Sequence, residues 1–377
     1  MKTRDYDILR QEAQASDKTS KTWDLKGLDP LSALWLEFWC TNGTTSNKGN
    51  FISDIITKVE VVDGSKPLIS LNMFELETLH FLKTGQSPGL FPSEHASGVQ
   101  RHGCYLLFGR RLWDPDFAFS PGRYKNPQLK LSWDLGAVRT IDTTTSFATG
   151  TLGITICAKV MEDVPIPPKY LSQVQVETFT APTSGNHKTE MVVNYPWRLL
   201  LLRNYLIGKD IDEIFDAVTI DCDSGKFKPL DKRYVRDLDS EALQTFGRSE
   251  FKHDVFTHHQ IGFREINNKE NSSKAHMYED TTGYICNVQY EWSSEGKLDI
   301  IDYNGAAVGT DKKVTLKEDG HAMHAILPIP FGRLEDPNSW FDATKFGKID
   351  LTQYVPAGGG AAAVSSVVLE QPRPNGE

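Results

Sequence analysis

The chain has 377 residues, 39% of them hydrophobic and 24% charged, which is enough for two domains with substantial cores and excludes a wholly disordered chain. No apolar run approaches the roughly 18–20 residues of a membrane-spanning helix, and the N-terminal residues lack the apolar region of a secretory signal. A net charge of −9 argues against sequence-independent nucleic-acid binding, and five scattered cysteines without a CxxC pair argue against a metal or redox motif.

Residues 1–23 mix charges of both signs and carry spaced apolar residues at Tyr6, Ile8 and Leu9. We interpret this segment as an N-terminal arm outside the first domain. Two interpretations of the arm stay open: a short amphipathic helix that lies on a membrane or on a neighbouring molecule, and a frayed terminus.

Residues 24–161 are predicted to form a first β-rich domain. Short runs of β-favouring residues are separated by turn residues, and the segment 72–83 has apolar residues at helical spacing after a polar N-cap. The informative segments, in chain order, are LSALWLEFWC (31–40), FISDIITKVEVVDGSKPL (51–68), FGRRLWDP (108–115), QLKLS (128–132) and GTLGITICAKV (150–160).

Residues 162–191 are rich in Pro, Ser and Thr, a composition that suits an extended connector. A second domain is predicted at 192–371, followed by a C-terminal tail at 372–377. Its segments repeat those of the first domain in the same order: YPWRLLLLRNYLIG (195–208), DIDEIFDAVTIDCDSGKFKPL (210–230), a helical pattern (238–246), FGRLEDP (331–337), KIDLT (348–352) and AAAVSSVVLE (361–370).

This repeated order indicates an internal duplication. Four apolar positions of one segment align at a constant offset with four of the other, namely Ile52, Ile55, Val59 and Val61 with Ile211, Ile214, Val218 and Ile220. Proteins rich in β-structure reuse such patterns because strands and turns need them, which explains any single segment. It does not explain several segments in one order, so we favour duplication.

The two copies differ in length between the helical pattern and the FGR segment. The first copy uses 84–107, whereas the second uses 247–330, which we interpret as an inserted loop region. GYICNVQYEW (283–292) and KLDIIDYNG (297–305) are predicted to form a strand pair within it. Polar stretches such as REINNKENSSK (264–274) favour a solvent-facing tower.

The predicted fold class is all-β. Parallel α/β folds need a crossover helix after most strands, whereas each copy here has one convincing short helix. We therefore expect two tandem β-sandwiches of antiparallel sheets, each with a short helix.

This organisation resembles the double jelly-roll major capsid proteins of tailless icosahedral viruses, the lineage of membrane-containing phages, adenoviruses and related archaeal viruses. Those proteins have two tandem eight-stranded jelly rolls, each with a short helix, together with an N-terminal arm, a linker and loops that form outward-facing towers. All these features have counterparts here, over nearly the whole chain. The resemblance rests on organisation, without a short sequence signature.

The resemblance implies a structural major capsid protein, a homotrimer whose six jelly rolls form a pseudo-hexagonal block that tiles an icosahedral shell. The implied partners are copies of itself, neighbouring capsomers, penton and minor capsid proteins, and an internal membrane through the N-terminal arm, but no sequence-specific nucleic acid. The implied location is the virion, such as that of a bacteriophage, assembled inside the host cell. No catalytic residue, metal or cofactor is expected.

The FGR…DP segments are the candidate site, as a repeated structural motif: Phe108, Gly109, Arg110, Asp114 and Pro115, and Phe331, Gly332, Arg333, Asp336 and Pro337. One interpretation pairs each Arg with the Asp of its own segment across a turn at a subunit boundary. In the simpler interpretation Gly permits a bulge, Pro ends the strand and the ion pair holds a corner. Neither interpretation is catalytic.

Patterns for other chemistry are weak. A bicupin metal site needs His-x-His on one strand, whereas the candidate pairs are His258-His259, which are adjacent, and His321 with His324, which are three apart. The tract 221–225 places carboxylates at alternate positions but lacks the spacing of a calcium loop, so a turn is the simpler interpretation.

Two further possibilities concern a thiol and the indole rings. Cys104 beside His102 lacks a nucleophile elbow and suits a core position. The alternative function is a carbohydrate-binding or carbohydrate-processing protein of two β-sandwiches, in which four indoles stack on sugars: Trp35, Trp39, Trp113 and Trp133. Most of these lie in apolar strands, where a core role is simpler.

Overall fold

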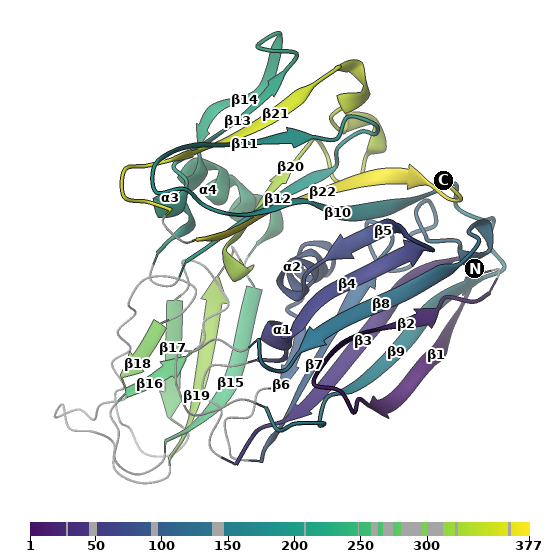
Figure 1. Cartoon of the computed structure of the whole chain (residues 1–377), viewed down its shortest axis with the longest axis vertical. Coiled ribbons are helices and arrows are strands. Elements are labelled where there is room, and N and C mark those ends of the chain that lie inside the picture. The colour runs from purple at the N-terminus through teal and green to yellow at the C-terminus, as the bar shows by residue number, and fades with distance from the viewer. Residues whose placement is uncertain are drawn as a thin grey trace.

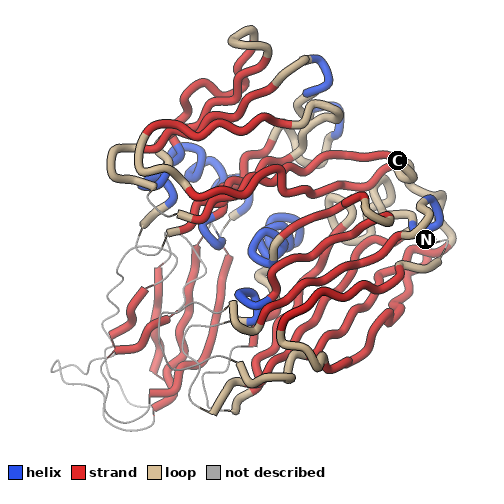
Figure 2. The backbone as a smooth tube through the Cα atoms, viewed as in Figure 1, coloured by secondary structure: helices blue, strands red, loops and turns tan. Residues whose placement is uncertain are grey.

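The computed structural model describes residues 1–27, 29–44, 51–91, 97–137, 147–206, 209–247, 249–257, 263–266, 274–279, 296–299, 312–320, 323–360 and 363–377. The chain is mainly β, with few short helices and several antiparallel sheets (Figures 1 and 2). No helix in these ranges is long and apolar enough to cross a membrane.

The first half of the chain builds two sheets that face each other across a hydrophobic core, and we call this unit the first sandwich. One sheet has the order β1-β9-β3-β7-β6, with bounds Lys2–Ala13, Gly153–Glu162, Leu31–Thr41, Val99–Leu107 and Gly89–Phe91. The facing strands have the order β2-β8-β4-β5, with bounds Lys18–Asp24, Pro127–Asp134, Ile56–Asp63 and Lys66–Leu71.

The second half builds a second sandwich with its own core. One set of strands has the order β10-β22-β12-β20, with bounds Lys169–Thr180, Val364–Pro374, Leu199–Tyr205 and Ile326–Pro330. The facing sheet has the order β11-β21-β13-β14, with bounds Gly185–Met191, Ile349–Val355, Ala217–Cys222 and Phe227–Tyr234. A parallel bridge between Ser70 of β5 and Val174 of β10 joins strands of both sandwiches into one eight-stranded sheet.

The two sandwiches repeat one plan. In one sheet of each sandwich the order is the same: β1-β9-β3-β7 in the first corresponds to β10-β22-β12-β20 in the second. The facing sheets correspond as well, β2-β8-β4-β5 to β11-β21-β13-β14. The helices correspond as well: α1 (Ile52–Ile55) and α3 (Ile211–Ile214) precede β4 and β13, and α2 (Met73–Thr84) and α4 (Val235–Phe246) follow β5 and β14. The repeated sequence segments thus lie on corresponding elements.

The terminal segment and the connector are structured differently from the expectation. Residues 1–23 were expected as an arm, helical or frayed, but they carry β1 and most of β2, and 162–191 carries β10 and β11. For the terminal segment the reason is that β1 lies at the edge of its sheet. Almost every residue of β1 is exposed, so its sequence shows no apolar alternation that would reveal a strand.

Helix α2 has strong local signals at both ends. The side chain of Asn72 accepts a hydrogen bond from the backbone of Glu75, whose carboxylate accepts one from the Asn72 backbone, which makes a capping box. Gly85 ends the helix in the left-handed conformation, with φ of 69°. The helix therefore starts and stops where the sequence predicts.

The insertion before β20 adds further strands beside the second sandwich (Figure 1). Strands β15 (Ser249–Thr257), β19 (Lys312–Gly320) and β17 (Lys274–Glu279) form one sheet, and β16 (Phe263–Ile266) pairs with β18 (Gly296–Asp299). The predicted strand at 283–292 lies outside the described residues, as does most of 297–305. Short 3-10 turns complete the described elements: η1 (Pro121–Arg123), η2 (Met323–Ala325), η3 (Pro337–Ser339) and η4 (Ala343–Lys345).

Candidate functional site

The repeated FGR…DP segments form the turns that follow β7 and β20. Phe108 and Phe331 come directly after these strands, and both are buried. Each strand therefore ends before its Phe, and neither proline terminates it. Pro115 is exposed in the first turn, whereas Pro337 opens the 3-10 turn η3.

The two glycines are required for different reasons. A Cβ atom at Gly109 would lie 2.6 Å from the carbonyl oxygen of Phe117, so only glycine fits this close approach. Gly332 has a φ of +75°, and a Cβ there would collide with the backbone of Ser339. Both turns thus need glycine, but their backbones differ.

Arg110 and Asp114 form a buried bidentate ion pair. Nε of Arg110 lies 2.7 Å from Oδ2 of Asp114 and Nη2 lies 2.8 Å from Oδ1, with side-chain exposures of 6% and 0%. Burial alone would raise the pKa of Asp114, but the hydrogen bonds from Arg110 outweigh it and hold the pKa below its ordinary value. This pair holds the corner of the first turn.

The second turn lacks this ion pair. Arg333 is exposed and forms no ion pair within the described part of the chain, and Asp336 accepts a hydrogen bond from the backbone N–H of Asn338 instead. The physical reason is spacing, because four positions separate Arg110 from Asp114 but three separate Arg333 from Asp336. The one-residue difference between the segments decides which turn has the pair.

The two turns touch each other within one chain. Nη1 of Arg110 donates a hydrogen bond to the backbone carbonyl of Glu335 at 2.6 Å, and Nη1 of Arg111 lies 3.0 Å from Oε2 of the same residue. The repeated motif therefore lies at the boundary between the two sandwiches.

A buried ionic cluster lies beside these turns. Nζ of Lys83 on α2 lies 2.5 Å from Oε2 of Glu370 on β22, and both side chains are 1% exposed. Arg198 and Gln173 also donate to the Glu370 carboxylate, and Lys83 donates to the carbonyl of Gly109. Desolvation lowers the pKa of Lys83 to about 8.

Further along α2, Glu75 faces the second sandwich. Its Oε1 atom accepts hydrogen bonds from Ser366 at 2.5 Å and from Gln175 at 2.9 Å, and burial raises its pKa. The guanidinium of Arg203 on β12 lies 4.5 Å from the ring centre of Phe74. The polar face of α2 is thus covered by β10, β22 and β12.

Glu77 forms a third contact with the second sandwich. Its carboxylate lies 2.6 Å from Nε2 of His324 and 3.1 Å from Nε2 of His102. Nearby, Nδ1 of His80 accepts a hydrogen bond from the backbone of Tyr105 at 2.9 Å. Desolvation lowers the pKa of His80 to about 4.

Sequence reasoning missed these junction residues. When charged side chains such as Glu75, Glu77 and Lys83 lie on one face of a short helix, the sequence predicts that this face is exposed to solvent. Here residues 90 or more positions later cover that face. The capping signature that includes Glu75 was present, but nothing local marks a carboxylate that becomes buried by another sandwich.

Within the described residues, the other candidate residues are not brought together into one cluster. Cys104 is fully buried in the first core, and desolvation raises the pKa of its thiol well above the ordinary value. His258, His259 and His321 lie outside the described residues. The tract 221–225 spans the turn between β13 and β14. Among the residues that the structure describes, no group of His, Cys, Asp and Glu is arranged to hold a metal ion.

The four candidate tryptophans lie in different environments. Trp133 is buried in the first core, and its indole nitrogen donates to the carbonyl of Ser16. Trp35 and Trp39 are half-buried, each close over a glycine of a neighbouring strand. Trp113 is half-buried in the first FGR turn. Trp133 belongs to β8 and Trp113 to the first FGR turn, so the four indoles do not lie on one strand.

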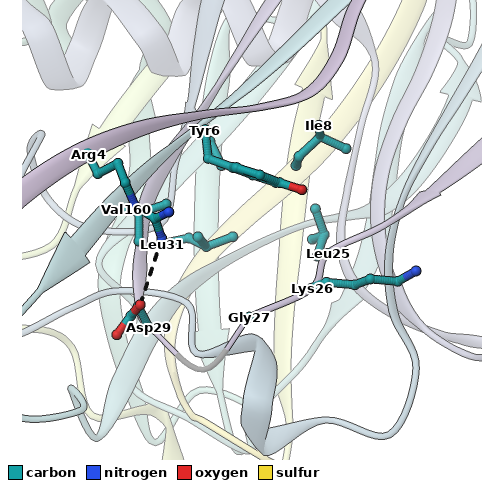
Figure 3. A pocket seen from close by; sticks show the side chains of 10 residues that line it. Arg4, Tyr6, Ile8, Leu25, Lys26, Gly27, Asp29, Leu31 and Val160 are labelled. Carbon is teal, nitrogen blue, oxygen red and sulfur yellow. Dashed lines mark ion pairs between the residues drawn. The ribbon is translucent and has the colours of Figure 1, made fainter.

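A shallow groove of about 230 Å³ lies along β1 (Figure 3). Its apolar lining includes Ile8, Leu31 and the ring of Tyr6, and Arg4 lies 4.0 Å from Asp29 at its rim. Among the described residues that line it there is no histidine, cysteine or serine. The groove therefore suits an apolar contact better than a reaction.

No protein-family model matches the sequence, and no curated protein matches it either. Solved structures do match. The major capsid protein of Sulfolobus turreted icosahedral virus superposes with a TM-score of 0.57 and 10% identity, over 98% of this chain and 96% of that chain. The PBCV-1 virus capsid gives a TM-score of 0.59 and 9% identity, over 98% and 93% of the two chains.

The major capsid protein P2 of bacteriophage PM2 matches with a TM-score of 0.51 and 12% identity, over 98% of this chain and 97% of that chain. The chain has the double jelly-roll fold of these major capsid proteins. Because all identities are 12% or lower, the likeness concerns the fold. In this chain the FGR turns and α2 lie at the contact between the two sandwiches.

Proposed function

We propose that this chain is a structural major capsid protein, which self-assembles as trimers into the shell of an icosahedral virion. The observation that carries the proposal is one strand order built twice, in a fold shared over 98% of the chain with the three capsid proteins. Two like units per chain allow three chains to present six similar walls. No catalytic step is part of this function.

In this proposal each sandwich is one jelly roll with its short helix. The first spans β1 to β9 and the second β10 to β22, so the arm and the connector become strands of the rolls. The strands β15 to β19 form the tower on the outer surface, where a long insertion cannot obstruct lateral packing. Neighbouring capsomers and penton and minor capsid proteins are the proposed partners, and the assignment of the virus as a bacteriophage stays a prediction.

The test is the mass of the purified full chain by light scattering during gel filtration, followed by electron microscopy at raised concentration. Trimers that form hexagonal arrays or closed shells are expected. A monomer at every concentration would overturn the proposal. Specific retention on immobilised glycans by a monomer would favour the carbohydrate-binding alternative.

A further inference from the structure

The contact between the two sandwiches joins unlike surfaces. The first sandwich contributes strand β5 and helix α2, and the second contributes the edge of β10 and the outer face of β22 and β12. On that face Leu199, Leu201 and Val368 are buried in the core cluster of the first sandwich. The second sandwich thus contacts the first through the edge of β10 and through one face of the sheet that β10 begins.

Each partner surface of this contact has a counterpart elsewhere in the chain. Within the described residues, β14 ends the strand order β11-β21-β13-β14 as β5 ends β2-β8-β4-β5, so β14 is the counterpart of β5. Strand β1 begins the order β1-β9-β3-β7 as β10 begins β10-β22-β12-β20, so β1 is the counterpart of β10. Helix α4 has the same length as α2, and their first residues, VRDLDS and MFELET, share the alternation of an acid, leucine and an acid. In Figure 1 β14 lies near the top of the molecule and β1 at its lower right.

Strand pairing defines the counterparts residue by residue. Arg203 of β12 pairs with Ser366 of β22, and Glu37 of β3 pairs with Thr155 of β9. The pairing with the next strand gives the same alignment of β12 with β3. Leu199 pairs with the last residue of β20, and Ala33 pairs with the last residue of β7, so Leu199 and Ala33 are counterparts. Arg203 is four positions after Leu199 and Glu37 is four positions after Ala33. They therefore occupy the same place on the outer faces of their sheets.

A bulge confirms this alignment at the sheet edge. The pairing of β10 with β22 shifts after Gln175, which pairs with Val368. The pairing of β1 with β9 shifts after Asp7, which pairs with Cys157. The edge of β1 thus has the irregular shape of the edge on which β5 docks.

We infer that β14 and α4 of one copy dock on β1 and on the outer face of β9 and β3 of the next copy, in the way that β5 and α2 dock on β10, β22 and β12 within the chain. The inference rests on the proposed function, because it names the partner surfaces of that self-assembly. The contact is head-to-tail, so repetition about a threefold axis closes a ring.

The strands involved carry exposed aromatic side chains. Tyr6 on β1 is 49% exposed, and Phe227 and Tyr234 on β14 are 48% and 58% exposed. Trp35 lies on the outer face of β3, at the place of the buried Leu201, whereas Tyr6 and the groove of Figure 3 lie on the inner side of β1, beside Ala158 and Val160. Apolar side chains in these places favour burial against a partner.

One pair of opposite charges supports the same pairing. Within the chain, Phe74 at the second position of α2 meets Arg203. The counterparts are Arg236, at the second position of α4, and Glu37, which carry opposite charges. Neither forms an ion pair with another residue in the described ranges of this chain. The docked arrangement brings these two charges together between copies.

The test reverses these charges in the full chain. Arg236→Glu alone and Glu37→Arg alone are each expected to weaken trimerisation at least about tenfold, because like charges then face each other. The double variant restores the pair in the opposite sense and is expected to recover trimers in sedimentation velocity. Lys188→Glu on β11, at the opposite edge of its sheet from β14, is the control and is expected to remain trimeric.

The outcomes separate this inference from the proposed function. A monomeric wild type would overturn both, whereas a trimer that tolerates both single reversals would overturn the docking surfaces alone. If a reversal prevents folding, Glu37→Cys with Arg236→Cys replaces it. Oxidation should then link copies covalently into dimers and trimers on denaturing gels, and a trimer that stays unlinked would contradict the inference.

Discussion

Nζ of Lys83 lies 2.5 Å from Oε2 of Glu370, and this ion pair crosses the boundary between the two sandwiches. Both side chains are removed from water, so each depends on the other for compensation of its charge. The pair couples α2 of the first sandwich to the last strand of the second, and the two units are expected to unfold together.

Lys83→Met should destabilise the chain by about 3 kcal/mol, because it leaves the buried Glu370 with Arg198 as its remaining cation. Chemical denaturation measures the change. The control is Lys188→Met, which removes an exposed partner of Asp350 and should cost much less than Lys83→Met. Equal effects of the two substitutions would contradict a buried ion pair.

Acid should weaken the contact between α2 and β7 through His80. Its pKa in the folded chain is lowered to about 4 from an ordinary 6.5, so the fold favours the neutral ring. The resulting stability is complete above pH 6.5 and is lost as the pH falls towards 4, by up to about 3 kcal/mol. His80→Gln should remove this part of the pH dependence of unfolding, and the same pH profile in both proteins would refute the assignment.

The two FGR turns should respond differently to one conservative change. Arg110→Lys loses the bidentate geometry with Asp114 and should cost about 2 kcal/mol. Arg333→Lys changes an exposed side chain and should alter the free energy of unfolding by less than about 0.5 kcal/mol. Thermal unfolding of both variants is the comparison, and equal shifts would mean that the turns are equivalent after all.

Gly332→Ala should cost more than about 3 kcal/mol, because a positive φ is combined with a collision against the backbone of Ser339. Gly64 offers a matched control, since its φ of +61° is similar but no atom lies within 4 Å of the added carbon. Gly64→Ala should cost about 1 kcal/mol. Denaturant midpoints that do not separate the two variants would argue against the collision.

The features that the sequence predicted are local or repeated ones. Helix α2 is determined by its cap at Asn72 and by Gly85, and the glycines of the FGR turns mark close backbone approaches. The duplication was visible because core positions such as Val59 and Val218 repeat an apolar residue at corresponding places in two cores. Such signals need only neighbours in the chain or a second copy of the same pattern.

The sequence by itself therefore determined the mainly β class, the repeat of one plan, the short helices and the places of the repeated turns. The tertiary structure alone decided that 2–13 forms an edge strand and 169–180 an inner strand that joins the two sandwiches, that Glu75 and Lys83 are buried, and that, within the described residues, Arg110 has an ion pair whereas Arg333 has none. The physical reason is distance along the chain. Edge pairing and the burial of charge depend on strands such as β9 and β22, which lie about 150 to 290 residues away from their partners, and no local pattern records them.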